Sequence, residues 1–175
     1  MNAANVLDLR LNAKKALPKP VFDFIDGAGF EEKTLNANTS DFEKWRFRQY
    51  VMRDISKRNL ETTIVGEKSS MPAAISPTGM SGILRGTRAE VYAARAAKKA
   101  GIPFTLGMMS IASLEEVVEA AGAVWFQLCL LKDRGLVQML VDRALAADAP
   151  VLIVTVTWPT MGQTNRFIRN RTTSL

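Results

Sequence analysis

The C-terminal two thirds of the chain repeat a pattern in which short apolar runs alternate with longer amphipathic segments. The runs are nearly continuous stretches of Val, Ile, Leu, Phe and Ala, as expected for parallel strands covered on both faces. We predict four strands, at residues 72–76, 103–107, 124–130 and 151–157. Strand starts recur roughly every 20 to 30 residues, which is the spacing of repeated βα units.

The segments between these runs carry helical signals. Residues 88–100 are alanine-rich and are followed by Gly101, a residue typical of helix C-termini. Ser113 and Glu116 have the spacing of a capping box at the start of the next helix. Residues 133–147 place their apolar side chains on one face with a 3.6-residue period. The chain is therefore predicted to be α/β, either as a doubly wound sheet or as part of a closed barrel.

The first 70 residues follow a different pattern. Residues 4–38 indicate short helices, which Pro18 and Pro20 interrupt and which the glycines at 27 and 29 punctuate. Residues 42–70 indicate irregular and short extended pieces. No Ser/Gly/Pro-rich linker separates this part from the rest. We therefore expect residues 1–70 to be an N-terminal extension packed on residues 71–175, with one structural domain overall.

Composition narrows the class of protein further. A hydrophobic content of 47% and a charged content of 23% are ordinary for a soluble globular protein. The sequence has no continuous apolar stretch long enough for a membrane-spanning helix and no signal-peptide pattern at its start. Its single cysteine, Cys129, lies in an apolar run, which fits a reducing compartment and predicts a cytoplasmic location.

Charge and residue types argue against nucleic-acid and metal chemistry. The net charge is +6, but the basic residues are dispersed and form no long run with interleaved aromatics. The chain has no histidine and no cysteine cluster, so we expect no metal site and no histidine-based proton transfer. Four carboxylates at helical spacings are expected to be solvated: Glu31, Glu32, Glu115 and Glu116.

Polar side chains near the C-terminal ends of the predicted strands are the candidates for a binding site, because α/β proteins place their sites there. They include Gln127 in an otherwise apolar strand, and Thr155 in the next one. The residues alone favour a Gln127 that hydrogen-bonds neighbouring backbone, and a strand-forming Thr155. Cys129 is more simply a small buried residue than a nucleophile, since no base is evident beside it.

Motifs that occur together in one order and spacing lie at residues 21–29, 34–38, 71–79, 93–97, 113–117, 125–128, 132–134, 155–162 and 169–170. In order and spacing they resemble the FMN-dependent α-hydroxy acid oxidoreductases, a family that includes glycolate oxidase and L-lactate dehydrogenase. The resemblance covers essentially the whole chain. The bacterial L-lactate dehydrogenase branch looks nearest, through residues 25–27, 60–63 and 101–106.

This resemblance implies a (β/α)8 TIM barrel that binds FMN across its C-terminal mouth and oxidises a small 2-hydroxy acid, similar to L-lactate, to a 2-oxo acid. About four βα units would be present, which is half a barrel with two unpaired edges. Where the family usually has Ser, this chain has Gly107. By resemblance, the flavin-binding positions are Ala74, Ser76, Pro77, Thr78, Gly79, Gly107, Gln127 and Thr155.

The departures from the family concern substrate chemistry. Phe24 and Cys129 stand at positions of active-site tyrosines, and Thr164 stands at that of a carboxylate-binding arginine, with Arg166 nearby but out of register. Thr157 replaces the aspartate that pairs with the family's catalytic histidine. The candidate substrate-binding positions are therefore Phe24, Cys129 and Thr164.

The family's catalytic histidine, lysine and second arginine would lie beyond Leu175, so the chain is assigned no catalytic residue. We therefore expect the isolated chain to have little activity. The alternatives are a non-catalytic half-barrel that pairs with a second copy or with a complementary half, and a truncated gene product. By resemblance, peripheral attachment to the inner membrane is a further expectation.

Overall fold

The computed structural model of the protein describes residues 3–86, 88–156 and 162–171. The backbone divides into two compact units. One unit comprises Met1–Asp54 together with Trp158–Leu175, and the other comprises Ile55–Thr157. The expected packing of residues 1–70 on the rest, as one domain, stays a prediction.

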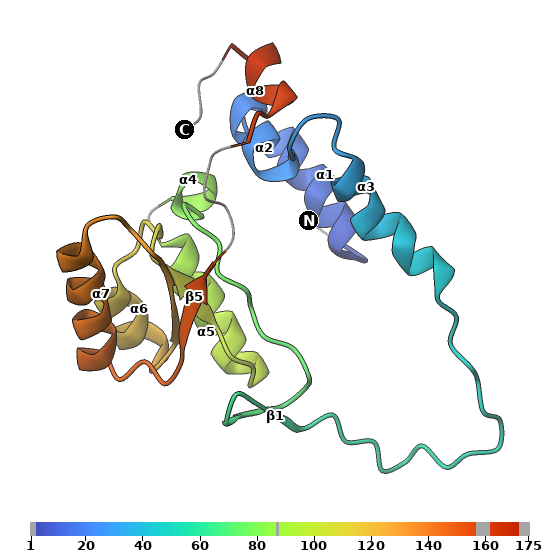
Figure 1. Ribbon diagram of the computed structural model, residues 1–175. Helices are drawn as coiled ribbons and strands as arrows, with labels where there is room; N and C mark the ends of the chain where they lie inside the picture. The colour runs from blue at the N-terminus through green and yellow to red at the C-terminus, as the bar shows by residue number, and fades with distance from the viewer. Residues whose placement is uncertain (1–2, 87, 157–161, 172–175) are drawn as a thin grey trace. The chain divides into compact units, whose positions relative to one another are not determined.

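The larger unit contains a parallel sheet, of which β5 is labelled in Figure 1. Its strand order is β3-β4-β5. The strands are β3 (Thr105–Gly107), β4 (Trp125–Cys129) and β5 (Leu152–Thr155). Phe126 is the partner of Leu106 in β3 and of Leu152 in β5, which fixes the register across the sheet. The predicted strands at 103–107, 124–130 and 151–157 therefore form, with shorter bounds.

The predicted strand at 72–76 is present only as a single parallel bridge between Ile75 and Phe104, on the β3 side of the sheet. The bridge is supported by hydrogen bonds from Ile75 N–H to the Pro103 carbonyl at 2.9 Å and from Thr105 N–H to the Ile75 carbonyl at 3.0 Å. Pro72 and Pro77 flank this piece and have no N–H to donate to a ladder, which limits its length.

Helices connect the strands as the sequence pattern predicts. They are α5 (Ala89–Ala100), α6 (Leu114–Ala121) and α7 (Arg134–Ala146), with a short α4 (Gly82–Arg85) before them. The capping box at α6 is confirmed, because Ser113 Oγ accepts from Glu116 N–H at 3.2 Å and Glu116 accepts from Ser113 N–H at 2.8 Å. The helix α5 ends where Gly101 adopts a φ of +67°, a conformation that favours glycine.

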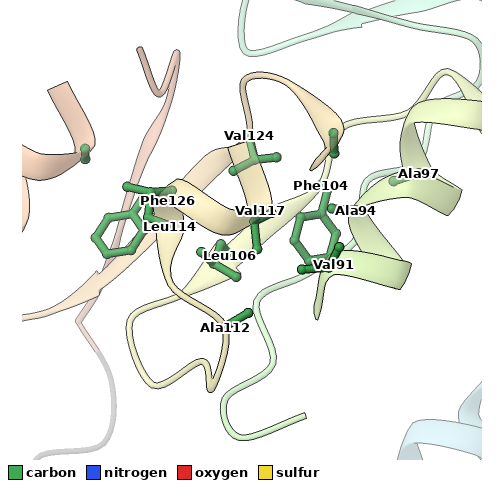
Figure 2. Packing of buried hydrophobic residues seen from close by; sticks show 12 residues of the cluster. Val91, Ala94, Ala97, Phe104, Leu106, Ala112, Leu114, Val117, Val124 and Phe126 are labelled. Carbon is green, nitrogen blue, oxygen red and sulfur yellow. The ribbon is translucent and has the colours of Figure 1, made fainter. Parts of the chain in front are cut away.

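The hydrophobic core of this unit lies where α5 and α6 pack against β3 and β4 (Figure 2). Val117 and Leu106 are fully buried at its centre, and Phe104 lies beside Val91 and Ala94 of α5. On β5 the side chains of Leu152 and Val154 stay about 40% exposed. Among the described residues, β5 is therefore an edge strand whose apolar side chains are only partly covered.

An antiparallel hairpin precedes the parallel sheet in the same unit. It consists of β1 (Thr62–Ile64) and β2 (Glu67–Ser69), with Thr63 paired to Lys68. Both turn residues, Val65 and Gly66, have positive φ, as a tight two-residue hairpin turn requires.

The regular elements in the described part of the other unit are helices, and residues 45–54 of this unit are irregular. Its elements are α1 (Val6–Ala16), α2 (Lys19–Asp26), α3 (Lys33–Ser40), a 3-10 turn η1 (Asp41–Lys44) and α8 (Asn165–Arg169). Pro18 separates α1 from α2 as the sequence predicts, whereas Pro20 lies in the first turn of α2 and does not interrupt it. The helix α2 ends at Gly27, as predicted. The rings of Phe24 in α2 and Phe167 in α8 stack with centroids 5.9 Å apart.

Candidate functional site

The C-terminal edge of the parallel sheet is organised around the side-chain amide of Gln127. Its Oε1 accepts from Met108 N–H at 3.3 Å, and its Nε2 donates to Thr155 Oγ1 at 2.8 Å and to Cys129 Sγ at 3.2 Å. The residue is 8% exposed. Both amide N–H groups are engaged, while the oxygen keeps capacity for one more hydrogen bond.

Gly107, at the end of β3, lies directly beside this amide. A Cβ at this position would lie 3.4 Å from Gln127 Oε1 and 3.7 Å from both Gly79 N and Pro77 Cβ. The loop that follows Ile75 therefore reaches the end of β3. The rest of that predicted flavin segment is largely exposed: Ala74, Ser76 and Thr78.

The structure thus brings together the predicted flavin positions on neighbouring strand ends, through Pro77, Gly79, Gly107, Gln127 and Thr155. The interpretation of Gln127 from the residues alone is only partly right. Its oxygen does bond backbone, but its nitrogen bonds two side chains from its own strand and from β5.

The predicted substrate positions are divided between the two units. Cys129 lies in the larger unit, where it is half-buried and accepts from the Gln127 amide, and its backbone N–H contacts Met108 Sδ at 3.0 Å. Phe24 stacks on Phe167 in the helical unit. Thr164 is the N-cap residue of α8 in that same unit. Thr157 lies outside the described residues.

A buried carboxylate that the sequence did not single out contacts the two loops of this edge, which follow Ile75 and the end of β3 at Gly107. Glu90, in the first turn of α5, is 2% exposed, and its Oε1 accepts from the N–H groups of Gly82 at 3.0 Å and Ile111 at 3.3 Å. The only sequence signal for Glu90 is a glutamate at the start of an alanine-rich helix. That pattern is typical of a solvated first turn, so it does not predict a buried carboxylate.

The helical unit contains a network of ion pairs centred on Arg166 of α8. Its Nη1 donates to Asp26 at 2.9 Å and its Nη2 donates to Glu32 at 2.8 Å, while Nη1 also contacts Asp23 at 3.4 Å. Asn170 donates to Asp23 at 2.7 Å, one helical turn further along. These contacts tie α8 to α2, across more than 130 residues of sequence.

The charges in this network shift each other's titration. Hydrogen bonds from Arg10 first, and from Arg166, hold the pKa of Asp26 at about 2. The hydrogen bond from Arg166 lowers the pKa of Glu32, and the same carboxylates raise the pKa of Arg166. The network stabilises ionised carboxylates, which is the opposite of what a general base with a pKa near neutrality needs.

The expectation that four glutamates are merely solvated needs correction at three of them, while Glu31 is exposed as expected. Glu32 pairs with Arg166 and is only partly exposed. Glu115 is exposed but pairs with Arg143 at 2.6 Å, and Glu116 closes the capping box of α6. Helical spacing does not reveal these partners, because the cations for Glu32 and Glu115 come from distant elements.

Comparison with known proteins identifies the family. The family model described as FMN-dependent dehydrogenase matches residues 13–175. The chain belongs to the FMN-dependent dehydrogenase family.

Two curated relatives in this family are L-lactate dehydrogenases. The chain is 45% identical to that of Vibrio parahaemolyticus over 156 residues, which cover 89% of this chain and 41% of the relative. It is 43% identical to that of Pseudomonas syringae over 163 residues, which cover 93% of this chain and 43% of the relative. The chain therefore spans about two fifths of the length of these relatives.

Solved structures give the same result. Mandelate oxidase superposes with a TM-score of 0.91 at 33% identity, over 99% of this chain and 50% of that one. A soluble mutant of the membrane-associated (S)-mandelate dehydrogenase from Pseudomonas putida superposes with a TM-score of 0.93 at 36% identity, over 98% and 49% of the two chains. These findings confirm the predicted family, FMN as its cofactor, and an α/β fold consistent with part of a barrel.

The sheet edge of this family member fits the ring of a flavin. Gly107 presents no side chain, and Gln127 keeps acceptor capacity on its oxygen. Polar contacts to ring atoms are how proteins of this chemistry bind and tune a flavin. In the described part of the chain, none of the helices has the length and hydropathy to span a bilayer.

Proposed function

We propose that this chain provides the flavin-ring side of an enzyme that oxidises a small 2-hydroxy acid, similar to L-lactate, to a 2-oxo acid. The observation that carries the proposal is the convergence of Gln127, Thr155, Gly107 and the 77–79 loop on one sheet edge in a member of this family. The L-lactate dehydrogenases among the relatives support the substrate class.

Each residue of this edge has a role in the proposal. The exposed segment from Ala74 to Gly79 lies along the ring, and Gly107 allows the ring to approach the strand ends. Gln127 and Thr155 orient the ring through polar contacts, with Thr155 holding the Gln127 amide in place. FMN, when bound, accepts the electrons that the substrate loses at its α-carbon.

The chain lacks several of the groups that the resemblance implies for substrate binding and proton removal. Phe24 has no hydroxyl to bind a carboxylate, Cys129 and Thr164 stand where the resemblance implies tyrosine and arginine, and the sequence has no histidine. Removal of a proton from the substrate requires a positioned base. We therefore propose that the 175-residue chain by itself turns over 2-hydroxy acids very slowly.

The proposed architecture is half of a (β/α)8 barrel with four βα units. The match to about half of the mandelate oxidase chain and the parallel order β3-β4-β5 support it. A peripheral association with a membrane is also part of the proposal, supported by the membrane-associated (S)-mandelate dehydrogenase among the similar structures.

FMN binding tests the flavin part of this proposal. Purified chain is titrated with FMN, and binding is followed through flavin fluorescence and through retained visible absorption after desalting. Replacing Gln127 by Leu should raise the FMN dissociation constant at least about tenfold, because it removes a hydrogen-bonding group from the site. The matched control is Gln138→Leu, on the exposed side of α7, which should bind as the unmodified chain does. A chain that retains no FMN at all would refute the proposal.

A second candidate is a non-catalytic half-barrel that pairs through its open sheet edges with a second copy or a complementary half. The partly exposed Leu152 and Val154 on the edge strand β5 favour it. Sedimentation velocity over a range of concentrations distinguishes the candidates. A monomer at all concentrations would contradict pairing between copies.

A further inference from the structure

The two loops of the proposed flavin edge are connected through a single buried carboxylate oxygen. Glu90 Oε1 accepts from Gly82 N–H at 3.0 Å and from Ile111 N–H at 3.3 Å. Gly82 follows the flavin segment that ends at Gly79, and Ile111 follows the end of β3 at Gly107. The helix α5 thus holds both loop backbones at one point, just beyond the residues proposed to contact the ring.

The loops also touch each other at this place. A Cβ on Gly82 would lie 2.6 Å from Ile111 Cβ, and one on Gly79 would lie 3.0 Å from Met109 Cβ. Met80 N–H donates to the Met109 carbonyl at 2.8 Å. Because the backbone of one loop contacts the side chains and a carbonyl of the other so closely, a displacement at either amide that Glu90 binds is transmitted to the glycines of the edge.

The buried position of Glu90 lowers the stability of the fold, which indicates a role beyond stability. Burying a carboxylate is costly, and hydrogen bonds offset only part of that cost. Its second oxygen, Oε2, is buried and has no hydrogen-bond partner among the residues that the structure describes. A glutamate that served only the dipole of α5 could perform that role from an exposed position in the first turn.

We infer that Glu90 is a positioning residue that sets the separation of the two loops, and thereby the geometry that the flavin ring meets. The inference rests on the proposed function for the identity of the ligand. Glu90 touches neither ring nor substrate in this arrangement and acts through the backbones of Gly82 and Ile111.

The test compares Glu90→Ala and Glu90→Gln with two control variants. Glu119→Ala removes an exposed glutamate from α6, and Val117→Ala removes buried methyl groups of the hydrophobic core from the same helix. Amide exchange of Gly82 and Ile111 is measured by NMR on the chain without flavin, and FMN affinity is measured by fluorescence titration. Glu90→Ala should raise the exchange rates of both amides and the FMN dissociation constant, each at least about tenfold.

Glu90→Gln should keep most of the amide protection and most of the FMN affinity, because its Oε1 can still accept from the two amides. Val117→Ala should lower global stability without selective acceleration at the two loops, and Glu119→Ala should change neither measurement. A merely structural role for Glu90 would reproduce the pattern of Val117→Ala.

Each remaining outcome is decisive. Unchanged exchange at Gly82 and Ile111 in Glu90→Ala overturns the inference, as does accelerated exchange with unchanged FMN affinity. If the unmodified chain binds no FMN, the proposed function fails, while the exchange data still show whether Glu90 fixes the loops. If Glu90→Ala does not fold, Glu90→Asp replaces it, because its shorter side chain cannot reach both amides, and unaltered protection at both would overturn the inference.

Discussion

Replacing Arg166 by Met tests whether the ion-pair network fastens α8 to α2. Methionine keeps much of the length and apolar stem of arginine while it removes the charge and all the guanidinium donors. Glu32 would lose both of its bonds to Arg166, whereas Asp26 would keep Arg10, and Asp23 would keep Lys19 and Asn170.

The magnitude follows from the exposure of the partners. Breaking a fully buried pair costs about 3 to 5 kcal/mol, and an exposed pair contributes about 0 to 1 kcal/mol. The Arg166 side chain is 21% exposed and the three carboxylates are 10 to 21% exposed, so the network lies between these limits. Since two of the carboxylates keep other donors, we expect a loss of about 2 kcal/mol, or about 30-fold in the local opening equilibrium.

Hydrogen exchange with mass spectrometry measures this opening in peptides that cover α2 and α8. The matched control is Arg143→Met, which breaks the Glu115 pair between side chains that are 44% and 56% exposed. That change should cost less than about 1 kcal/mol. If Arg166→Met opens α2 and α8 no more than Arg143→Met opens its own helix, the argument from burial is wrong.

The pH dependence gives an independent check with a defined sign. The pKa of Asp26 is about 2 in the folded chain, below its ordinary value of 3.8, and those of Asp23 and Glu32 are also lowered. A lowered carboxyl pKa contributes stability that is fully present above the unfolded value and is lost as pH falls through the folded value. The difference in exchange between Arg166→Met and the unmodified chain should therefore be constant near neutrality and disappear between about pH 4 and pH 2. A difference that persists below pH 2 would point to lost packing instead.

Two further changes test the fold of the larger unit. Ser113→Ala removes the side-chain acceptor for Glu116 N–H in the capping box of α6 and should cost about 1 kcal/mol, measured by urea unfolding followed by circular dichroism; an unchanged midpoint would mean that the box is not stabilising. Gly82→Ala places a Cβ within 2.6 Å of Ile111 Cβ and should cost about 1 to 3 kcal/mol while weakening FMN binding. Full stability in Gly82→Ala would contradict the close contact of the two loops.

The sequence predicted the regular part of the larger unit well, because local signals and burial agree there. The apolar run at 124–130 became β4, and the alanine-rich segment closed by Gly101 became α5 within a residue of its predicted start. The strand at 72–76 was predicted from the same kind of apolar run but forms only a bridge at Ile75. Periodicity reports which residues favour burial, and it does not report how many ladder bonds the flanking prolines allow.

The candidate site was only partly predictable. The resemblance placed Gln127, Gly107 and Thr155 at one edge, and the structure brings their atoms within hydrogen-bonding or van der Waals distance. The role of Glu90 was not predicted, nor was that of Arg166, which was noted only as out of register with a family arginine, and the reason is shared. Each is an ordinary charged residue on a helix, and its importance comes from partners that lie elsewhere in the sequence.

By itself, the sequence determined the elements, their order, the family and the cofactor class, because hydrophobic period, capping residues and motif spacing are properties of neighbouring positions. Only the tertiary structure decided which atoms those elements bring together. Glu90 bonds to two loops, Gln127 to the next strand, and Arg166 to carboxylates more than 130 residues away. Hydrogen bonds and ion pairs act over a few ångströms of space, so their partners are fixed by packing and not by separation along the chain.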